Sequence, residues 1–147
     1  MNKRFLKGLT YAGLIGVVVG IGSAFFMKEK MVLLEEEIQA IHFSPFEAYE
    51  AVNEDVAFSL LGGNGKDMMR NIIENARMTN EQTPDETPDY DMQVEYINGL
   101  PVHALHVWVG NDGDATRFRY TFGDGEIYKT SKKDGELFRT LLLEDTP

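Results

Sequence analysis

The sequence contains no cysteine, and it has only one tryptophan and three histidines in 147 residues. Without cysteine the chain forms no disulfide and accepts no lipid at a lipobox, so a lipoprotein is excluded and the fold must depend on packing alone. The motifs G-x-S-x-G and H-E-x-x-H are also absent. The sequence therefore carries neither the usual serine-hydrolase signature nor that of a zinc protease.

Positive charge is scarce beyond residue 30. Residues 31–147 hold nine Lys and Arg against 23 Asp and Glu, which gives a formal charge of −14. A surface of this sign repels phosphate backbones and anionic lipid headgroups, so nucleic acid is not an expected partner. Cations and basic partners are compatible with it.

The N-terminus contains nineteen consecutive uncharged residues, Leu9–Met27. As a helix this run is about 28 Å long, close to the hydrocarbon thickness of a bilayer. Three basic residues precede it and two follow it: Lys3, Arg4, Lys7, Lys28 and Lys30. This asymmetry predicts a single-pass signal-anchor in the cell membrane, with residues 1–30 as cytoplasmic tip and transmembrane anchor and residues 31–147 as an extracytoplasmic domain.

A cleaved signal peptide is the alternative interpretation of the same segment, with small residues suited to cleavage after Ala24. The apolar run is longer than the usual signal core of about 7 to 15 residues, so retention is favoured. Small residues also recur every four positions, at Gly8, Ala12, Gly16, Gly20 and Ala24. This stripe predicts a helix-packing face for a homodimer or for a membrane-helix or cell-envelope partner.

In residues 31–147 the expected strands follow one another instead of alternating with helices. Period-two patterns predict strands ending near residue 43 and over 55–60, 92–96, 102–109, 117–122 and 126–129. One helix is expected after the glycine-rich turn at 62–65, as far as Met78, and a last helix after the capping pair Ser131 and Asp134. Residues 79–89 are expected to be an extended acidic linker. The fold class is α+β, a small mostly antiparallel sheet with two helices on one face.

Three segments resemble the YhfM-like domains, which are small anchored or lipidated exported domains of Gram-positive bacteria. They are the hairpin Tyr-Ile-Asn-Gly at 96–99, the strand His-Val-Trp-Val-Gly at 106–110, and Glu-Ile-Tyr-Lys-Thr at 126–130 before the C-terminal helix. The resemblance covers about residues 36 to 143 and implies a shared fold. Because that family has no established activity, the resemblance implies no catalytic residues and no cofactor.

Two acidic turns are the candidate ligand sites. Asn111, Asp112 and Asp114 occupy the first turn and Asp124 the second, and their oxygens could hold an ion or a partner if the turns meet at one end of the sheet. Ordinary hairpin chemistry also explains both turns. His103 and His106 are three residues apart in a strand, so we expect them on opposite faces, unable to share a metal ion.

These patterns predict a membrane-anchored binding or regulatory module of unknown ligand, with no cofactor, no metal and no identified catalytic residue. The alternative is a small cell-envelope enzyme or ion-binding domain that uses the acidic turn residues. A concave, apolar pocket that gathers carboxylates would favour the enzyme, and carboxylates scattered around a flat face would favour the module.

Overall fold

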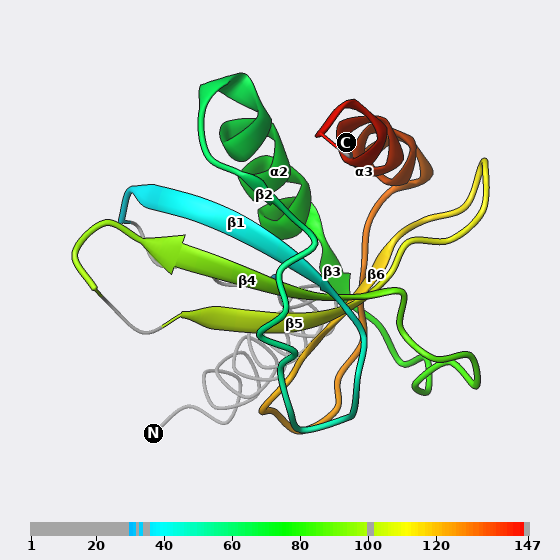
Figure 1. The fold of residues 1–147 in the computed structure, drawn as a ribbon. Helices are drawn as coiled ribbons and strands as arrows, with labels where there is room; N and C mark the ends of the chain where they lie inside the picture. Colours follow the sequence, from blue (N-terminus) through cyan, green and yellow to red (C-terminus); the bar gives the residue numbers. More distant parts are fainter. Residues whose placement is uncertain (1–29, 32, 34–35, 100–101, 146–147) are drawn as a thin grey trace, which may run out of the picture.

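A computed structural model describes residues 30–31, 33, 36–99 and 102–145 (Figure 1). In chain order its elements are β1 (Ile38–Pro45), β2 (Phe58–Leu60), α2 (Gly63–Asn75), β3 (Arg77–Met78), β4 (Tyr90–Tyr96), β5 (His103–Trp108), β6 (Arg117–Tyr120), β7 (Tyr128–Lys129) and α3 (Lys132–Asp145). The strands form one sheet in the order β2-β1-β4-β5-β6-β7-β3. Neighbouring strands are antiparallel throughout, and β5, which the sequence predicts to be apolar on both faces, is the central strand.

Both helices lie on one face of the sheet (Figure 1). Helix α2 buries its apolar residues at spacings of three and four, as an amphipathic helix on a core does. Phe43 of β1 shows how the layers meet, because its ring stacks on Phe58 of β2 at a centroid distance of 4.8 Å and contacts Phe138 of α3 edge-on at 6.2 Å. One continuous apolar core therefore fills the space between the helices and the sheet.

The start of α3 lies directly against the loop between β5 and β6. A Cβ atom at Gly135 would be 2.5 Å from the carbonyl oxygen of Asp114, so this close approach requires glycine. The amide of Asp134 donates to Ser131 Oγ at 3.0 Å, which confirms the predicted cap. Together these contacts fix α3 beside residues 109–116.

One local prediction is wrong. Helix α2 ends at Asn75, and Arg77–Met78 pairs with β7 as an edge strand where the sequence predicts a continuing helix. This error arises from a contact between residues far apart in the sequence, which local periodicity does not contain. Residues 79–89 contain no helix or strand, as predicted for an extended linker. The linker is attached to the sheet, because Trp108 Nε1 donates to the Glu86 carbonyl oxygen and the Thr79 amide donates to the Ile127 carbonyl oxygen, each at 2.8 Å.

The predicted fold class and localisation also need correction. Helices α2 and α3 have 13 and 14 residues, or about 20 Å each. Over the described ranges no helix is long and apolar enough to cross a membrane. The single-pass, signal-anchored architecture is therefore wrong as a description of this fold, which is a seven-stranded antiparallel sheet with two helices. Leu9–Met27 lies outside the described residues, as does the stripe formed by Gly8, Ala12, Gly16, Gly20 and Ala24.

The face of the sheet opposite the helices carries a row of polar side chains. Strand register places Ser44 of β1 beside Asp91 of β4, Asp91 beside His106 of β5, and His106 beside Arg119 of β6. We call these four residues the polar row. The row crosses four neighbouring strands at one level of the sheet.

Candidate functional site

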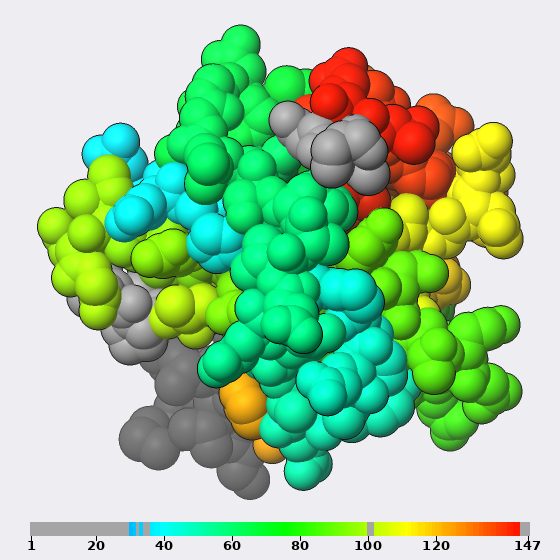
Figure 2. Space-filling view, viewed as in Figure 1, coloured from blue at the N-terminus to red at the C-terminus, as the bar shows by residue number. Residues whose placement is uncertain are grey.

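A groove of about 1100 Å³ lies at the end of the sheet where β4 begins and β5 ends. Three segments line it, namely the loop before β4, the loop between β5 and β6, and the end of α3. In Figure 2 these segments gather on the right of the molecule, coloured green, yellow and red. Its apolar lining comes from Pro84, Tyr90, Trp108, Val109 and Leu142, with the strongly exposed Leu143 beside them. We call this feature the sheet-end groove.

The two arginines of the sheet-end groove are engaged within the protein. Arg139 donates to the carbonyl oxygens of Val109 and Asp114, each at 3.0 Å, and so holds the β5–β6 loop against α3. Arg117 Nε donates to the Glu81 carboxylate at 2.8 Å. Both guanidinium groups are therefore attached to other parts of the protein by at least one hydrogen bond.

Glu81 is held by two cations from neighbouring strands. Its carboxylate accepts from Lys129 Nζ at 2.6 Å and from Arg117 Nε at 2.8 Å. The hydrogen bond from Lys129 and then that from Arg117 lower the pKa of this carboxyl below its ordinary value. Glu81 consequently remains charged at neutral pH and attaches residues 79–89 to the sheet.

Three other carboxylates of the sheet-end groove have no such partner. Among the described residues, the side chains of Glu86, Asp112 and Asp114 make no hydrogen bond or ion pair. Asp89 differs, because its Oδ2 accepts the Val109 amide at 2.7 Å. The groove therefore combines an apolar lining with carboxylates that remain available to a ligand.

The structure separates the two predicted acidic turns. Asn111, Asp112 and Asp114 line the sheet-end groove, whereas Asp124 lies in the turn at the opposite end of β6. Because β6 runs between the two turns, they do not meet as the ion-site hypothesis requires. Within the part of the chain that the structure describes, no group of three or more His, Cys, Asp or Glu is arranged to hold a metal ion.

The polar row contains a buried carboxylate–imidazole pair. His106 Nδ1 and Asp91 Oδ1 are 2.7 Å apart, and their side chains are 0% and 1% exposed. Asp91 Oδ2 accepts the backbone amide of Asn53 at 3.0 Å, so both carboxylate oxygens are occupied. The rings of Phe46 and Tyr49 meet the His106 ring edge-on at 5.3 and 5.4 Å. The loop between β1 and β2 therefore covers the pair.

His103 is not part of this cluster. It lies on the helix-covered face, where its Nδ1 is 2.8 Å from Tyr96 Oη, and partial burial lowers its pKa. His106 lies on the opposite face, which confirms the prediction that the two histidines cannot share an ion.

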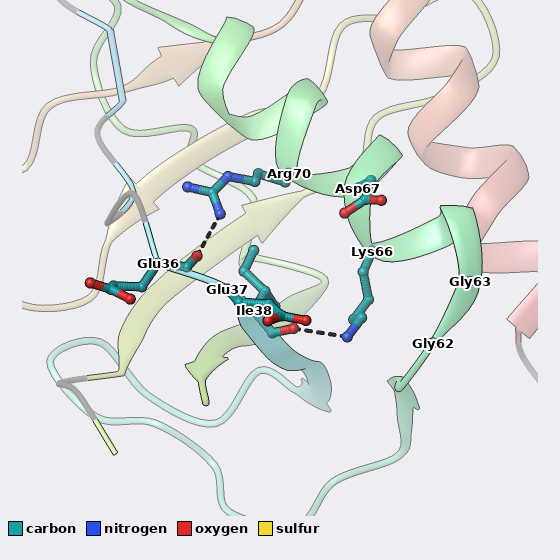
Figure 3. A pocket seen from close by; sticks show the side chains of 8 residues that line it. All are labelled: Glu36, Glu37, Ile38, Gly62, Gly63, Lys66, Asp67 and Arg70. Carbon is teal, nitrogen blue, oxygen red and sulfur yellow. Dashed lines mark hydrogen bonds between the residues drawn. The ribbon is translucent and has the colours of Figure 1, made fainter. Parts of the chain in front are cut away.

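A second depression, of about 450 Å³, lies where α2 begins (Figure 3). Lys66 Nζ donates to the Ile38 carbonyl oxygen and Arg70 Nη1 to that of Glu36, each at 2.8 Å. Both cations thus bind the strand entry, and the acidic side chains of Glu36, Glu37 and Asp67 line the same space. This arrangement stabilises the packing of α2 on β1 and offers no anion site.

Asp91 and Arg119 are chemically distinctive residues that sequence analysis missed, and it considered His106 only as a metal ligand. Asp91 alternates with the apolar Met92 and Val94, so it is expected to face solvent, yet it is 1% exposed. The covering loop causes this burial, and no local pattern reports such a loop. These polar residues become neighbours only when the strands pair in the observed register, and a single sequence does not reveal that register.

Comparisons with known proteins yield one fold relationship. No family model matches the sequence, and no curated protein matches it. A solved structure, a thioesterase-like protein from Clostridium sporogenes, superimposes with a TM-score of 0.54 at 12% sequence identity, covering 72% of this chain and 94% of that chain. At this identity the likeness shows a shared fold alone, and the resemblance to the YhfM-like domains stays a prediction.

Proposed function

We propose that this domain is a binding module whose sheet-end groove takes a ligand that combines a positive charge with an apolar group. The observation that carries the proposal is the division of charges in the groove, where the arginines are engaged internally and three carboxylates are not. The proposal keeps the binding role predicted from the sequence and gives it a location.

The charge of the free carboxylates supports a cationic ligand. Glu86, Asp112 and Asp114 lie on two of the segments that line one groove, so an ammonium or guanidinium group placed there would be attracted by more than one of them. Such pairs are individually weak at a solvent-exposed site, each contributing about 0.2–1 kcal/mol. Several of them acting on one cation provide selectivity for charge.

The apolar lining supports a second contact on the same ligand. Leu142 is largely buried while Leu143 is 79% exposed, and Tyr90 and Val109 are partly exposed beside them. Burying an aliphatic or aromatic group against these side chains contributes about 25 cal/mol per Å² of apolar surface. A basic residue next to a hydrophobic residue in a peptide has the chemistry that this lining matches.

Calorimetric titration with the peptide acetyl-Phe-Lys-amide tests the proposal, with acetyl-Phe-norleucine-amide as its uncharged control. We expect the lysine peptide to bind and the norleucine peptide to bind more weakly. Replacing Asp112→Asn and Asp114→Asn together should weaken the lysine peptide about tenfold, since two exposed pairs contribute on the order of 1 kcal/mol or more. Raising the salt concentration should weaken it as well, because ions screen these charges.

The matched control is the double variant Asp67→Asn and Glu136→Gln, which removes the same charge from exposed positions outside the groove. This variant should bind the lysine peptide as the unmodified protein does. Equal weakening in both double variants would reduce the effect to net charge and reject the groove. Absence of binding by either peptide would reject the proposed ligand chemistry.

A further inference from the structure

Arg119 is a cation without a counter-ion. The other arginines that the structure describes, Arg70, Arg77, Arg117 and Arg139, each donate hydrogen bonds to a carboxylate or a carbonyl oxygen. Arg119 makes no hydrogen bond or ion pair with any described residue, and its Nε is buried. Its guanidinium carbon lies 5.4 Å from the centre of the Tyr49 ring. This cation–π contact with Tyr49 leaves the buried Nε–H without an acceptor, and an unmatched donor on a cation in so acidic a chain indicates a place for an anion.

His106, the cross-strand neighbour of Arg119, also has an unused polar atom. An ionised carboxylate only accepts hydrogen bonds, and Asp91 accepts one from the amide of Asn53. His106 Nδ1 therefore carries the proton of the hydrogen bond that joins it to Asp91. In the neutral ring this leaves Nε2 with a lone pair, and Nε2 has no partner among the described residues although the side chain is fully buried. Oγ1 of Thr121, two residues beyond Arg119, is likewise buried and unpartnered within the described ranges.

The loop between β1 and β2 controls access to these atoms. Tyr49 is 42% exposed and contacts both His106 and Arg119, so it forms the outer wall of the region. Glu50, next to it, has a φ of 59°, which is uncommon for a residue other than glycine. The amide of Asn53 bonding to Asp91 fixes the far end of the loop. Because the loop covers these atoms, a small molecule reaches them only if the loop moves aside.

We propose that Arg119, His106 and Thr121 form a binding site for the carboxylate group of a small acid. One carboxylate oxygen accepts a hydrogen bond from Arg119 Nε and the other accepts one from His106 Nε2, which is protonated from solvent when the ligand binds, while Thr121 Oγ1 donates to either oxygen. Binding takes up one proton at His106 Nε2. The three neighbouring groups then alternate in charge, because Asp91 is negative, the imidazolium is positive and the ligand carboxylate is negative. The site is separate from the sheet-end groove and does not depend on it.

The surrounding groups favour an anion over a cation. Among the described residues, the titratable or charged groups against His106 are Asp91 from β4, Arg119 from β6 and Tyr49 from the covering loop. Asp91 is already satisfied, so a metal ion or an ammonium at Nε2 would meet the positive charge of Arg119 without a free carboxylate to offset it. Once Nε2 has taken up a proton, a carboxylate accepts hydrogen bonds from both unpartnered nitrogen atoms.

Nitrogen NMR of the His106 ring tests the proposal, with sodium acetate as the probe and sodium chloride at equal ionic strength as the reference. Without acetate, Nε2 should show the shift of an unprotonated ring nitrogen and Nδ1 that of a protonated one. Acetate through the millimolar range should move Nε2 to the protonated position. Calorimetry in two buffers of different ionisation enthalpy should show uptake of about one proton.

Arg119→Gln should weaken acetate binding about tenfold or more, because it removes a hydrogen bond to a charged group. Lys133→Gln, which removes an exposed cation on α3, should leave acetate binding unchanged. Tyr49→Ala opens the cover without removing a donor and should retain binding. Unchanged His106 shifts in acetate, or equal loss in the Arg119 and Lys133 variants, would overturn the proposal. The measurement of the His106 nitrogen shifts uses the unmodified protein, so it tests the proposal even if a variant fails to fold.

Discussion

The two faces of the sheet differ in how completely their side chains are satisfied. On the helix-covered face, apolar residues from β1, β4, β5 and β6 pack against α2 and α3, and aromatic rings contact one another. On the other face, three residues of the polar row and the nearby Thr121 contribute four buried polar atoms that have no partner among the described residues: Ser44 Oγ, His106 Nε2, Arg119 Nε and Thr121 Oγ1. The first face stabilises the fold by apolar packing, and the second contains hydrogen-bond donors and acceptors that have no partner among the described residues.

This difference has an energetic meaning. A buried polar atom that loses its water partners without gaining a protein partner costs about 1–3 kcal/mol. Four such atoms on one face are a cost that the apolar face must offset. Proteins tolerate such local costs at sites that bind or react, which is why the comparison of the two faces leads to the carboxylate site.

The largest expected effect is on the apolar face. Phe43 is fully buried and contacts the rings of Phe58, Tyr90 and Phe138. Phe43→Ala should lower the free energy of unfolding by about 3–5 kcal/mol, because it removes a large apolar group and leaves a cavity. Urea denaturation followed by circular dichroism measures this change.

The control for this change is Phe122→Ala. Phe122 is 72% exposed, so its truncation should change the free energy of unfolding by about 0.5 kcal/mol or less. Similar losses for the two phenylalanines would show that stability does not reside in the helix-covered face.

The sequence predicts the apolar face well because that face is built from local periodicity. The strand at 92–96, the central strand at 103–108 and the helix after Ser131 all appear where the alternation and the capping pair place them. Phe122 shows the limit of the method, since it continues the alternation of Phe118 and Tyr120 but lies beyond the end of β6 and is exposed. Strand ends depend on where the partner strand stops.

The polar face could not be predicted in the same way. Burial of Asp91 requires both the register that aligns it with His106 and the covering loop that carries Asn53. Neither is encoded within a few residues of Asp91. Asp112 and Asp114 were accessible to prediction because their turn is local, whereas their separation from Asp124 depends on the path of β6.

A second prediction tests whether the buried pair stabilises the fold. Asp91→Leu should lower the free energy of unfolding by about 3 kcal/mol, because the Nδ1 proton of His106 and the amide of Asn53 both lose their acceptor. The double variant Asp91→Leu, His106→Leu should be more stable than Asp91→Leu alone, since the unpaired imidazole is gone.

Thermal and urea unfolding of the two single variants and the double variant provide the cycle. Additive losses, with the double variant the least stable, would mean that the pair packs as two independent residues. In that case the polar face would contribute to stability much as the apolar face does.

The smallest expected effect concerns Glu81, which joins residues 79–89 to the polar face of β6 and β7. Its pKa is lowered in the folded protein by Lys129 and Arg117, so relative to an ordinary value of about 4.3 the unfolded chain binds the proton first as pH falls. The stabilisation is complete above that ordinary value and is lost as pH decreases through the lowered folded pKa. Because the carboxylate is 37% exposed, solvent screening limits its contribution to less than about 1 kcal/mol.

Unfolding measured from neutral pH to pH ~3 should therefore show a smaller acid-induced loss of stability in Glu81→Gln than in the unmodified protein. Glu136→Gln, an exposed change with no ion pair among the described residues, is the control, and an equal reduction in both variants would assign the acid sensitivity to net charge instead of to this contact.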